Sequence, residues 1–248
     1  MLPGITPMTE NEKEEILNGV QEWFSENIAS KHGENTKKAS KLNSYKYNPF
    51  LINYLAKFAF GEVTAENIAK VLVYPRVMGT SINTSFGQNI QNFISQALPG
   101  YASLVSGLDI EFFSKVDGKK KFCQLKAGPE TINKDDIASI TGHFKSIRNL
   151  ARTNQYPDFN ADRDCVVGVL YGERDELNSH YRKINEDYQV LIGQEFWYHL
   201  TGDSSFYSDI IKKFEECAES LNSSDAMNQS VKALTEEIKR EFQIFSGE

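Results

Sequence analysis

The sequence of 248 residues has little cysteine, little proline and no long hydrophobic run. Its three cysteines are widely spaced and form no CxxC pair, which argues against a disulfide framework and against a zinc site. No apolar stretch approaches the roughly 18 residues of a membrane-spanning helix, and the first residues form no basic leader. We therefore expect a cytoplasmic protein with reduced thiols and no membrane partner.

Basic charge is also scarce. Lys and Arg number 27 against 34 Asp and Glu, so the net charge is −7. The excess of acid lies at the two ends, because residues 1–30 and 200–248 each carry a net charge of −5. The centre, residues 31–199, then carries +3. The total alone speaks against nucleic acid as a partner, but a mildly basic centre leaves that partner open.

A composition of 40% hydrophobic and 25% charged residues indicates an ordinary globular chain. Apolar residues at helical spacing predict helices over residues 9–29, 49–74 (broken at Gly61), 88–97, 133–152, 194–200, 204–220 and 225–244. Alternating or fully apolar runs predict strands over residues 108–113, 122–126, 165–171 and 188–192. The order predicts an α/β or α+β fold, a mixed central sheet flanked by helices.

We expect one domain over residues 1–248. An N-terminal helix and a lysine-rich loop fill residues 1–48, a catalytic core spans 49–215, and a C-terminal helix occupies 216–248. The lysines of that loop are either plain surface or contacts to phosphate.

A β-hairpin is the segment with the clearest chemistry. Asp117-Gly118 is a strong turn signal between two alternating runs. A two-residue turn there places Glu111 opposite Gln124 and Asp109 opposite Lys126, all four on one face of the sheet. Two interpretations fit this face. It is either a solvent-exposed set of cross-strand pairs, or an oxygen-rich site for Mg²⁺ with a lysine beside it.

Polar segments next to helices supply the candidate contacts to DNA. The hydroxyl-rich residues 74–87 are predicted to be a loop that runs into a helix, which suits a phosphate or a base edge but also an ordinary capped turn. The helix at 133–152 either flanks a DNA site or is a plain solvated face. The candidate DNA-binding residues are Arg76, Thr80, Ser81, Asn83, Thr84, Ser85, Asn133, Lys134 and His143.

The hairpin also carries a resemblance. Asp109, fourteen further residues and then Gln124-Leu125-Lys126 resemble the motif of the PD-(D/E)XK nucleases. A narrower resemblance is to the type II restriction endonucleases of that superfamily. Three segments carry it, residues 74–87, 127–133 and 193–203. The resemblance implies that Asp109 and the Leu125 carbonyl hold the metal ion and that Lys126 is the catalytic lysine. Gln124 stands where the family usually has Glu or Asp, and Glu111 is the carboxylate that would restore the charge.

The resemblance further implies a type II restriction endonuclease of a restriction-modification system. Such an enzyme cuts double-stranded DNA site-specifically with Mg²⁺, leaves 5′-phosphate and 3′-hydroxyl ends, and acts as a homodimer. The subgroup it implies cuts G/C-rich interrupted palindromes of the GGNCC type. Two alternatives stay open, a structure-specific repair or junction nuclease of the same fold, and a catalytically inactive DNA-binding module.

Overall fold

The computed structural model describes residues 6–221 and 223–241, and these form two compact units. Residues 6–23 and 87–214 make the first, which we call the sheet unit. Residues 24–86, 215–221 and 223–241 make the second, the helical unit. The predicted start of the catalytic core at residue 49 does not coincide with a division between the two units, because residues 49–86 belong to the helical unit. Whether the two units make up one domain stays a prediction.

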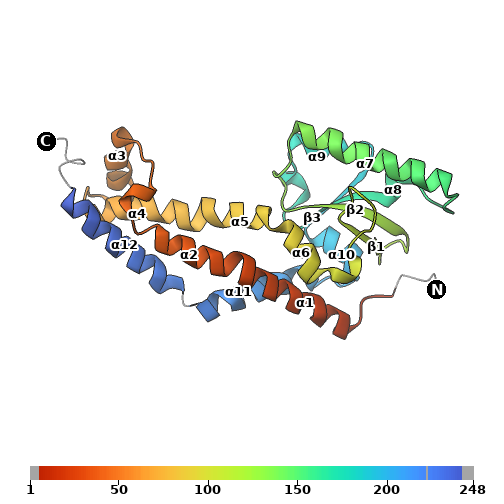
Figure 1. Cartoon of the computed structure of the whole chain (residues 1–248), viewed down its shortest axis with the longest axis horizontal. Helices are drawn as coiled ribbons and strands as arrows, with labels where there is room; N and C mark the ends of the chain where they lie inside the picture. The colour runs from red at the N-terminus through yellow and green to blue at the C-terminus, as the bar shows by residue number, and fades with distance from the viewer. Residues whose placement is uncertain (1–5, 222, 242–248) are drawn as a thin grey trace. The chain divides into compact units, whose positions relative to one another are not determined.

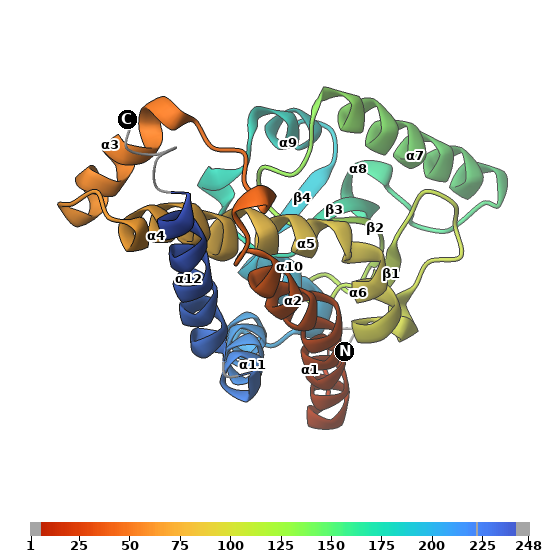
Figure 2. The same cartoon turned by 60° about the vertical axis from the view of Figure 1, so that its left-hand side comes forward.

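The sheet unit is built on four strands in the order β1-β2-β3-β4 (Figure 2). β1 pairs antiparallel with β2, whereas β2, β3 and β4 run parallel, so the sheet is mixed as expected. The parallel crossovers need intervening helices, and the chain places α7 and α9 there. The strands are β1 (Ile110–Phe113), β2 (Lys120–Lys126), β3 (Cys165–Val169) and β4 (Gln189–Ile192).

One face of the sheet is covered by α7 (Lys134–Thr153), α8 (Ala161–Asp164) and α9 (Ser179–Ile184) (Figure 1). The core of this face is formed by alternate strand residues and by one stripe of α7. Its members include Phe122, Val167, Val169, Val190 and Ile192 from the strands and Ile140, Phe144 and Ile147 from α7. The capping box predicted at the start of α7 is present, because Asn133 and Asp136 bond to one another's backbone N–H.

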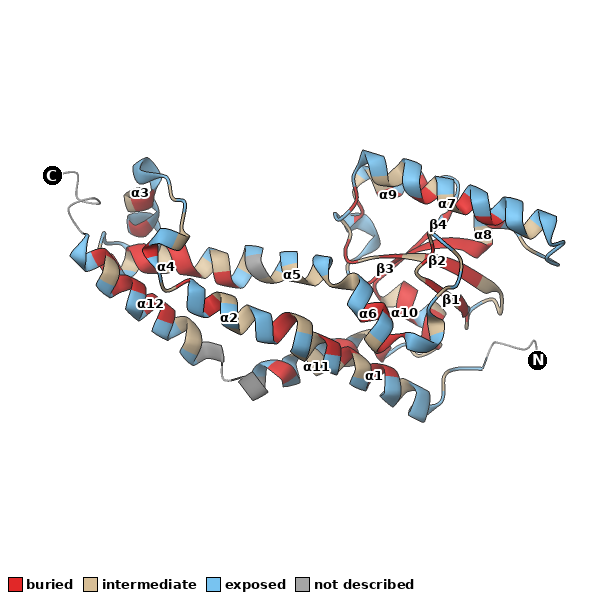
Figure 3. Ribbon diagram, viewed as in Figure 1, coloured by how far each residue is buried: buried red, intermediate tan, exposed pale blue. Residues whose placement is uncertain are grey.

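The opposite face of the sheet packs on α10 (Gln194–Thr201). The Phe196 ring meets the Phe112 ring edge-on at 6.3 Å. A Cβ atom on Gly168 of β3 would lie 2.6 Å from Phe196, so only glycine fits beneath that ring. With both faces covered, every residue of β3 is buried, which explains its fully apolar sequence (Figure 3).

The remaining helices of the sheet unit surround two tryptophans. Trp23 and Trp197 are buried as predicted, and each meets the ring of Phe93 edge-on. The helices around the two tryptophans are α1 (Glu10–Phe24), α6 (Ile90–Ala97) and the first part of α11 (Phe206–Leu221). The sheet unit also has short 3-10 turns at Pro99–Tyr101 and Arg174–Glu176.

The helical unit has its own apolar core, to which α3, α4 and α12 contribute together with Ala39 and Leu42, and α12 packs against α4 (Figure 2). The predicted break at Gly61 and the cap at Thr64 are confirmed, because Gly61 has a positive φ of 81° and the Thr64 side chain accepts the Asn67 N–H. The spacing of four apolar residues in the C-terminal helix predicts that they pack on the core or on a second subunit. Val231, Leu234 and Ile238 are buried in this core, and Phe242, the fourth, lies outside the described residues. The elements are a π-helix Ser25–Ala29, α2 (Ser30–Lys38), a 3-10 turn Leu42–Ser44, α3 (Pro49–Phe60), α4 (Ala65–Pro75), a π-helix Arg76–Ser81, α5 (Ile82–Gln88) and α12 (Ser223–Arg240).

Two predicted loops are wrong, since residues 30–38 and 74–88 are helical. Gly, Ser, Thr and Asn favour turns in isolation, but tertiary contacts override that preference here. Val77 is buried, and its carbonyl lies 2.8 Å from Nε2 of His32. The Thr84 hydroxyl donates back to the Thr80 carbonyl at 2.8 Å, which absorbs a side chain that would otherwise compete with the helix.

The three cysteines are free thiols and all are buried, in line with the reduced state expected. No helix within the described residues is long and apolar enough to cross a membrane.

Candidate active site

The hairpin register differs from the prediction by two residues. Ile110 lies opposite Cys123 and Glu111 opposite Phe122, so continuing the ladder brings Asp109 opposite Gln124. The turn is centred earlier than Asp117-Gly118, because Ser114 N–H bonds to the Lys119 carbonyl at 2.9 Å. A shift of two residues keeps every side chain on its predicted face. The predicted pairs of Glu111 with Gln124 and of Asp109 with Lys126 are therefore wrong, but their shared face is right.

Asp109 lies just before β1 and is fixed against β2 by its own carboxylate. Its Oδ2 accepts the backbone N–H of Leu125 at 2.7 Å, and its Oδ1 accepts the Gln91 amide at 3.3 Å. Its backbone N–H continues the ladder to the Cys123 carbonyl at 3.0 Å. The carboxylate is thus held beside Gln124 and Leu125, where the motif requires it.

Gln124 is held by its amide nitrogen and leaves its amide oxygen unused. Nε2 donates to the Gly107 carbonyl at 2.6 Å and lies 3.0 Å from Nδ1 of His143. Oε1 is buried and has no hydrogen-bond partner. A buried acceptor without a donor is costly, so this oxygen is available to a cation or to a donor from a ligand.

Lys126 closes β2 and forms an ion pair with Asp136 of α7. Its Nζ donates to Oδ1 at 3.0 Å, while the other carboxylate oxygen of Asp136 accepts the Asn133 N–H at 2.9 Å. Burial raises the pKa of Asp136, but the Asn133 N–H and the Lys126 ammonium outweigh it, so the pKa lies below its usual value. The helix cap therefore supplies a carboxylate that holds the lysine in place, a second role that its capping signal alone did not reveal.

Glu111 is engaged away from Gln124. One carboxylate oxygen accepts the Ser103 hydroxyl at 2.6 Å and the other pairs with Lys120 at 2.7 Å. Burial raises the pKa of Glu111, but these two partners outweigh it and lower the pKa below its usual value. Its predicted role as a metal ligand stays a prediction, which these contacts do not support.

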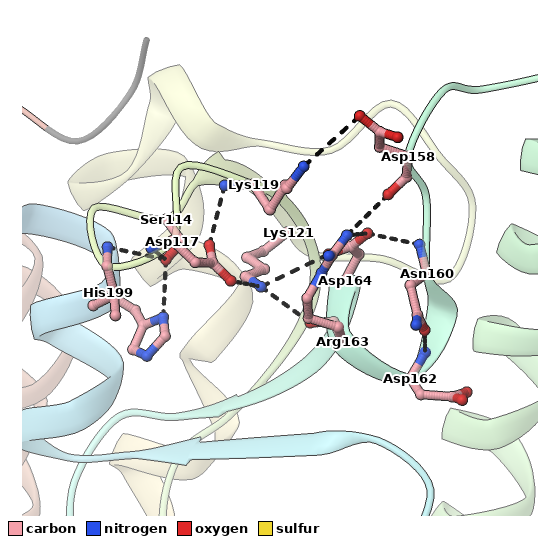
Figure 4. Close-up of polar contacts among 11 residues, drawn as sticks. Ser114, Asp117, Lys119, Lys121, Asp158, Asn160, Asp162, Arg163, Asp164 and His199 are labelled. Atoms are coloured by element: carbon pink, nitrogen blue, oxygen red, sulfur yellow. Dashed lines mark hydrogen bonds and ion pairs between the residues drawn. The ribbon is translucent and has the colours of Figure 1, made fainter. Parts of the chain in front are cut away.

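The far end of the hairpin is anchored by buried charges (Figure 4). Lys121 is fully buried, with its Nζ 2.6 Å from Asp117 and 3.8 Å from Asp164. It also donates to the Arg163 carbonyl at 3.1 Å, and the Arg163 guanidinium binds both oxygens of Asp164. These contacts tie the start of β2 to the residues that lead into β3, so the strand that carries Gln124 and Lys126 is fixed at its other end.

The candidate DNA contacts do not form one cluster. Asn133 is the cap of α7, and Lys134 is its exposed first residue. Arg76 donates to the Ser44 carbonyl and stacks on Tyr45. Six of the candidates lie in the helical unit, on the helical segment that replaces the predicted loop, and these are Arg76, Thr80, Ser81, Asn83, Thr84 and Ser85. The side chain of Ser81 lies outside the described part of the chain. Their contact with DNA stays a prediction.

Two residues of the site have contacts that the sequence did not predict. His143 was expected to contact DNA, which stays a prediction, and its Nδ1 lies 3.0 Å from Nε2 of Gln124. Gly107 received no site role from the sequence, although a glycine before a predicted strand hints at a special backbone conformation, and here φ is +84°.

The donor set suits a hard cation. The Asp109 carboxylate, the vacant Gln124 Oε1 and a backbone carbonyl of β2 are all oxygens, the ligands that Mg²⁺ prefers. Within the described residues, no three His, Cys, Asp or Glu side chains gather closely enough to hold a metal ion. Any metal site here must therefore use the amide or the backbone oxygens in addition to Asp109.

The mixed sheet, its helical layers and this hairpin are those of a restriction endonuclease-like nuclease. A family model described as type II restriction endonuclease EcoO109I matches residues 18–222, and no curated protein matches. The chain belongs to the EcoO109I family of type II restriction endonucleases. DNA is therefore its substrate class and hydrolysis its reaction class.

Proposed function

We propose that the chain cuts double-stranded DNA at a specific site in a Mg²⁺-dependent reaction that leaves 5′-phosphate and 3′-hydroxyl ends. The observation that carries this proposal is the buried, partnerless Oε1 of Gln124 on a hairpin that also holds Asp109 and Lys126. Three oxygens and an ammonium group in this order match the needs of phosphodiester hydrolysis better than those of a plain surface pairing.

The chain's own residues have separate tasks in this reaction. Asp109, Gln124 Oε1 and the Leu125 carbonyl would hold Mg²⁺, which supplies positive charge to the scissile phosphate. The Lys126 ammonium, steadied by Asp136, orients the attacking water and offsets negative charge at the phosphorus. The water gives up a proton to the solvent as its oxygen bonds to phosphorus, and the bond from phosphorus to the 3′ oxygen breaks. The 3′ oxygen takes up a proton from the solvent, and the phosphate stays on the 5′ end.

A digestion of several unmethylated phage genomes with the full chain and Mg²⁺ tests this function. Wild type should give discrete fragments whose ends a ligase rejoins without prior treatment. Lys126→Ala should slow cleavage by about a hundredfold or more. Lys119→Ala changes a lysine at the far end of the same hairpin and serves as the matched control, which should cut normally.

Three results would contradict the proposal. They are no discrete fragments from any genome, unchanged cutting by Lys126→Ala, and a preference for branched over linear duplexes. The last would indicate a structure-specific nuclease instead. The recognition subgroup stays a prediction that the fragment ends would test.

We further propose that the active form is a homodimer joined through α3. A two-fold protein matches the two-fold symmetry of a palindromic DNA site. The outer face of α3 is a continuous apolar stripe, with Phe50 89% and Phe58 77% exposed and Tyr54 stacked on Phe58. Leu51 and Leu55 extend it at helical spacing. Burial of an exposed apolar stripe against a partner is favourable, and α3 of a second copy presents the same stripe for this contact.

A further inference from the structure

We propose that His143 is a positioning residue, which together with Gly107 fixes the orientation of the Gln124 amide so that Oε1, and not Nε2, is offered at the active site. This inference rests on the proposed function, because it concerns the same site. The DNA contact that the sequence suggested for His143 stays a separate prediction.

The need for such a device follows from the chemistry of the amide. The two oxygens of a carboxylate are equivalent, so a Glu or Asp at this position would present a ligand in either orientation. An amide has one acceptor end and one donor end, and only the oxygen can bind a cation. Gln124 is therefore useful as a ligand only if its side chain is held one way round.

Both protons of the Gln124 Nε2 have an acceptor. The Gly107 carbonyl lies 2.6 Å away and His143 Nδ1 lies 3.0 Å away. The reversed amide would place Oε1 at 2.6 Å from a carbonyl oxygen, two acceptors without a proton between them. Since Gly107 requires a donor at this place, His143 accepts through Nδ1 and carries its proton on Nε2. Oε1 is then left without a protein partner, which is what a ligand oxygen requires.

The position of the imidazole ring is itself built into the fold. Gly107 has φ +84°, and a Cβ atom on it would lie 2.5 Å from Cδ2 of His143. Gly107 thus has two roles: it adopts the positive φ without strain, and its lack of a Cβ atom leaves room for the His143 ring. On the other side, α7 is anchored by buried Phe144 and Ile147, so the helix that carries His143 cannot easily turn.

Mn²⁺ binding by the full chain without DNA tests this role, measured by the EPR signal of the free ion. His143→Leu removes the acceptor and should weaken Mn²⁺ binding about tenfold, since partners that orient a ligand are worth about 10–100-fold in metal affinity. His143→Asn keeps an acceptor oxygen close to the place of Nδ1 and should bind nearly as wild type does. Asp109→Asn removes the proposed carboxylate ligand and should weaken binding at least as much as His143→Leu. Thermal unfolding shows that each variant is folded.

The outcomes separate the inference from the function. If Asp109→Asn weakens Mn²⁺ binding but His143→Leu does not, the positioning role is overturned and the metal site stands. If His143→Leu and His143→Asn lose affinity equally, an acceptor at Nδ1 is not what matters, and the role is again overturned. If wild type binds no Mn²⁺, or Asp109→Asn binds like wild type, the metal site fails and this inference fails with it.

Discussion

Gln124 shows how one atom changes the demands on its surroundings. Where the family usually has a carboxylate, this chain has a neutral amide whose Nε2 is bound and whose Oε1 is buried without a partner. The neighbours that orient it, Gly107 and His143, have no visible link to it in the sequence. At this scale, function depends on hydrogen bonds between residues that are far apart along the chain.

The variant Gly107→Ala tests that arrangement by adding a single Cβ atom beside the His143 ring. An added Cβ is strained at φ +84° and meets the His143 ring, so the free energy of unfolding should fall by about 1–3 kcal/mol. Mn²⁺ affinity should fall as well, because the ring that orients Gln124 must move. Urea unfolding and Mn²⁺ titration measure the two effects.

Gly142→Ala is the matched control for that substitution. Gly142 lies on α7 beside His143, and nothing stands within 4 Å of its added Cβ. Alanine is the better helix former, so this variant should gain about 0.4–1 kcal/mol and keep its Mn²⁺ affinity. Equal behaviour of the two variants would show that the crowding at Gly107 has no effect.

Helices and strands are tied together in the sheet unit by a few charged side chains. Lys13 of α1 bonds to Asp203 at 2.6 Å and to Asp209 of α11 at 2.8 Å. Lys121 links the hairpin turn to the start of β3 in the same way. Such ties join elements whose apolar faces alone do not specify how they are aligned.

The tie between Lys13 and Asp209 predicts a dependence of stability on pH. The Lys13 hydrogen bond lowers the pKa of Asp209 to about 2 from 3.8. A lowered pKa stabilises the folded state fully above the unfolded value, and this stabilisation is lost as pH falls from about 4 through 2. Asp209→Asn should therefore be less stable than wild type at pH 7, and the difference should shrink across that window. Thermal unfolding at several pH values measures it, and a difference that stays constant would refute the link.

The Lys121 cluster predicts a loss of stability on substitution. Lys121→Met leaves the Arg163 carbonyl without its donor and removes the ammonium partner of Asp117, whereas Asp164 keeps both bonds from Arg163. We expect a loss of about 1–3 kcal/mol in the free energy of unfolding. Lys119→Met, on the same turn but 40% exposed and 3.9 Å from Asp158, should lose less than about 0.5 kcal/mol. A Lys121→Met variant as stable as its control would show that the buried ammonium contributes nothing net.

At the scale of the whole molecule, one group of exposed apolar side chains forms a stripe along a single helix, α3. Phe50, Tyr54 and Phe58 of α3 are exposed although α3 also packs inward through Ile52 and Ala56. A helix that is apolar on both sides has one face for its own core and one for a partner. The expected partner is a second copy of the chain.

The double substitution Phe50→Asp and Phe58→Asp should therefore give a monomer. Buried aromatic anchors are worth about 2 kcal/mol or more each, so the dimer should weaken by about a hundredfold or more. Sedimentation equilibrium measures the dissociation constant of the dimer. Leu150→Asp alters a residue of α7 that is 49% exposed and should leave the dimer intact. A monomeric wild type, or a double variant that stays dimeric, would contradict the role of α3.

Local sequence patterns determined the elements whose signals lie within a few residues. The capping box of α7, the break at Gly61, the apolar β3 and the face shared by Asp109, Gln124 and Lys126 could all be predicted, since period and capping are local properties. The motif in its order along the chain also determined the family. These features do not depend on contacts between distant residues.

Tertiary structure alone decided the features that depend on distant contacts. The hairpin turn is centred one residue earlier than Asp117-Gly118, which shifts the register by two residues, because Lys121 is buried against Asp117 and Asp164 and the Ser114 N–H closes the turn. Residues 76–81 are helical around Val77, whose burial composition could not show. The partners of the site, Asp136 for Lys126 and His143 for Gln124, are 10 and 19 residues away. Such pairs form only when the helix is packed on the sheet, so no local pattern in the sequence specifies them.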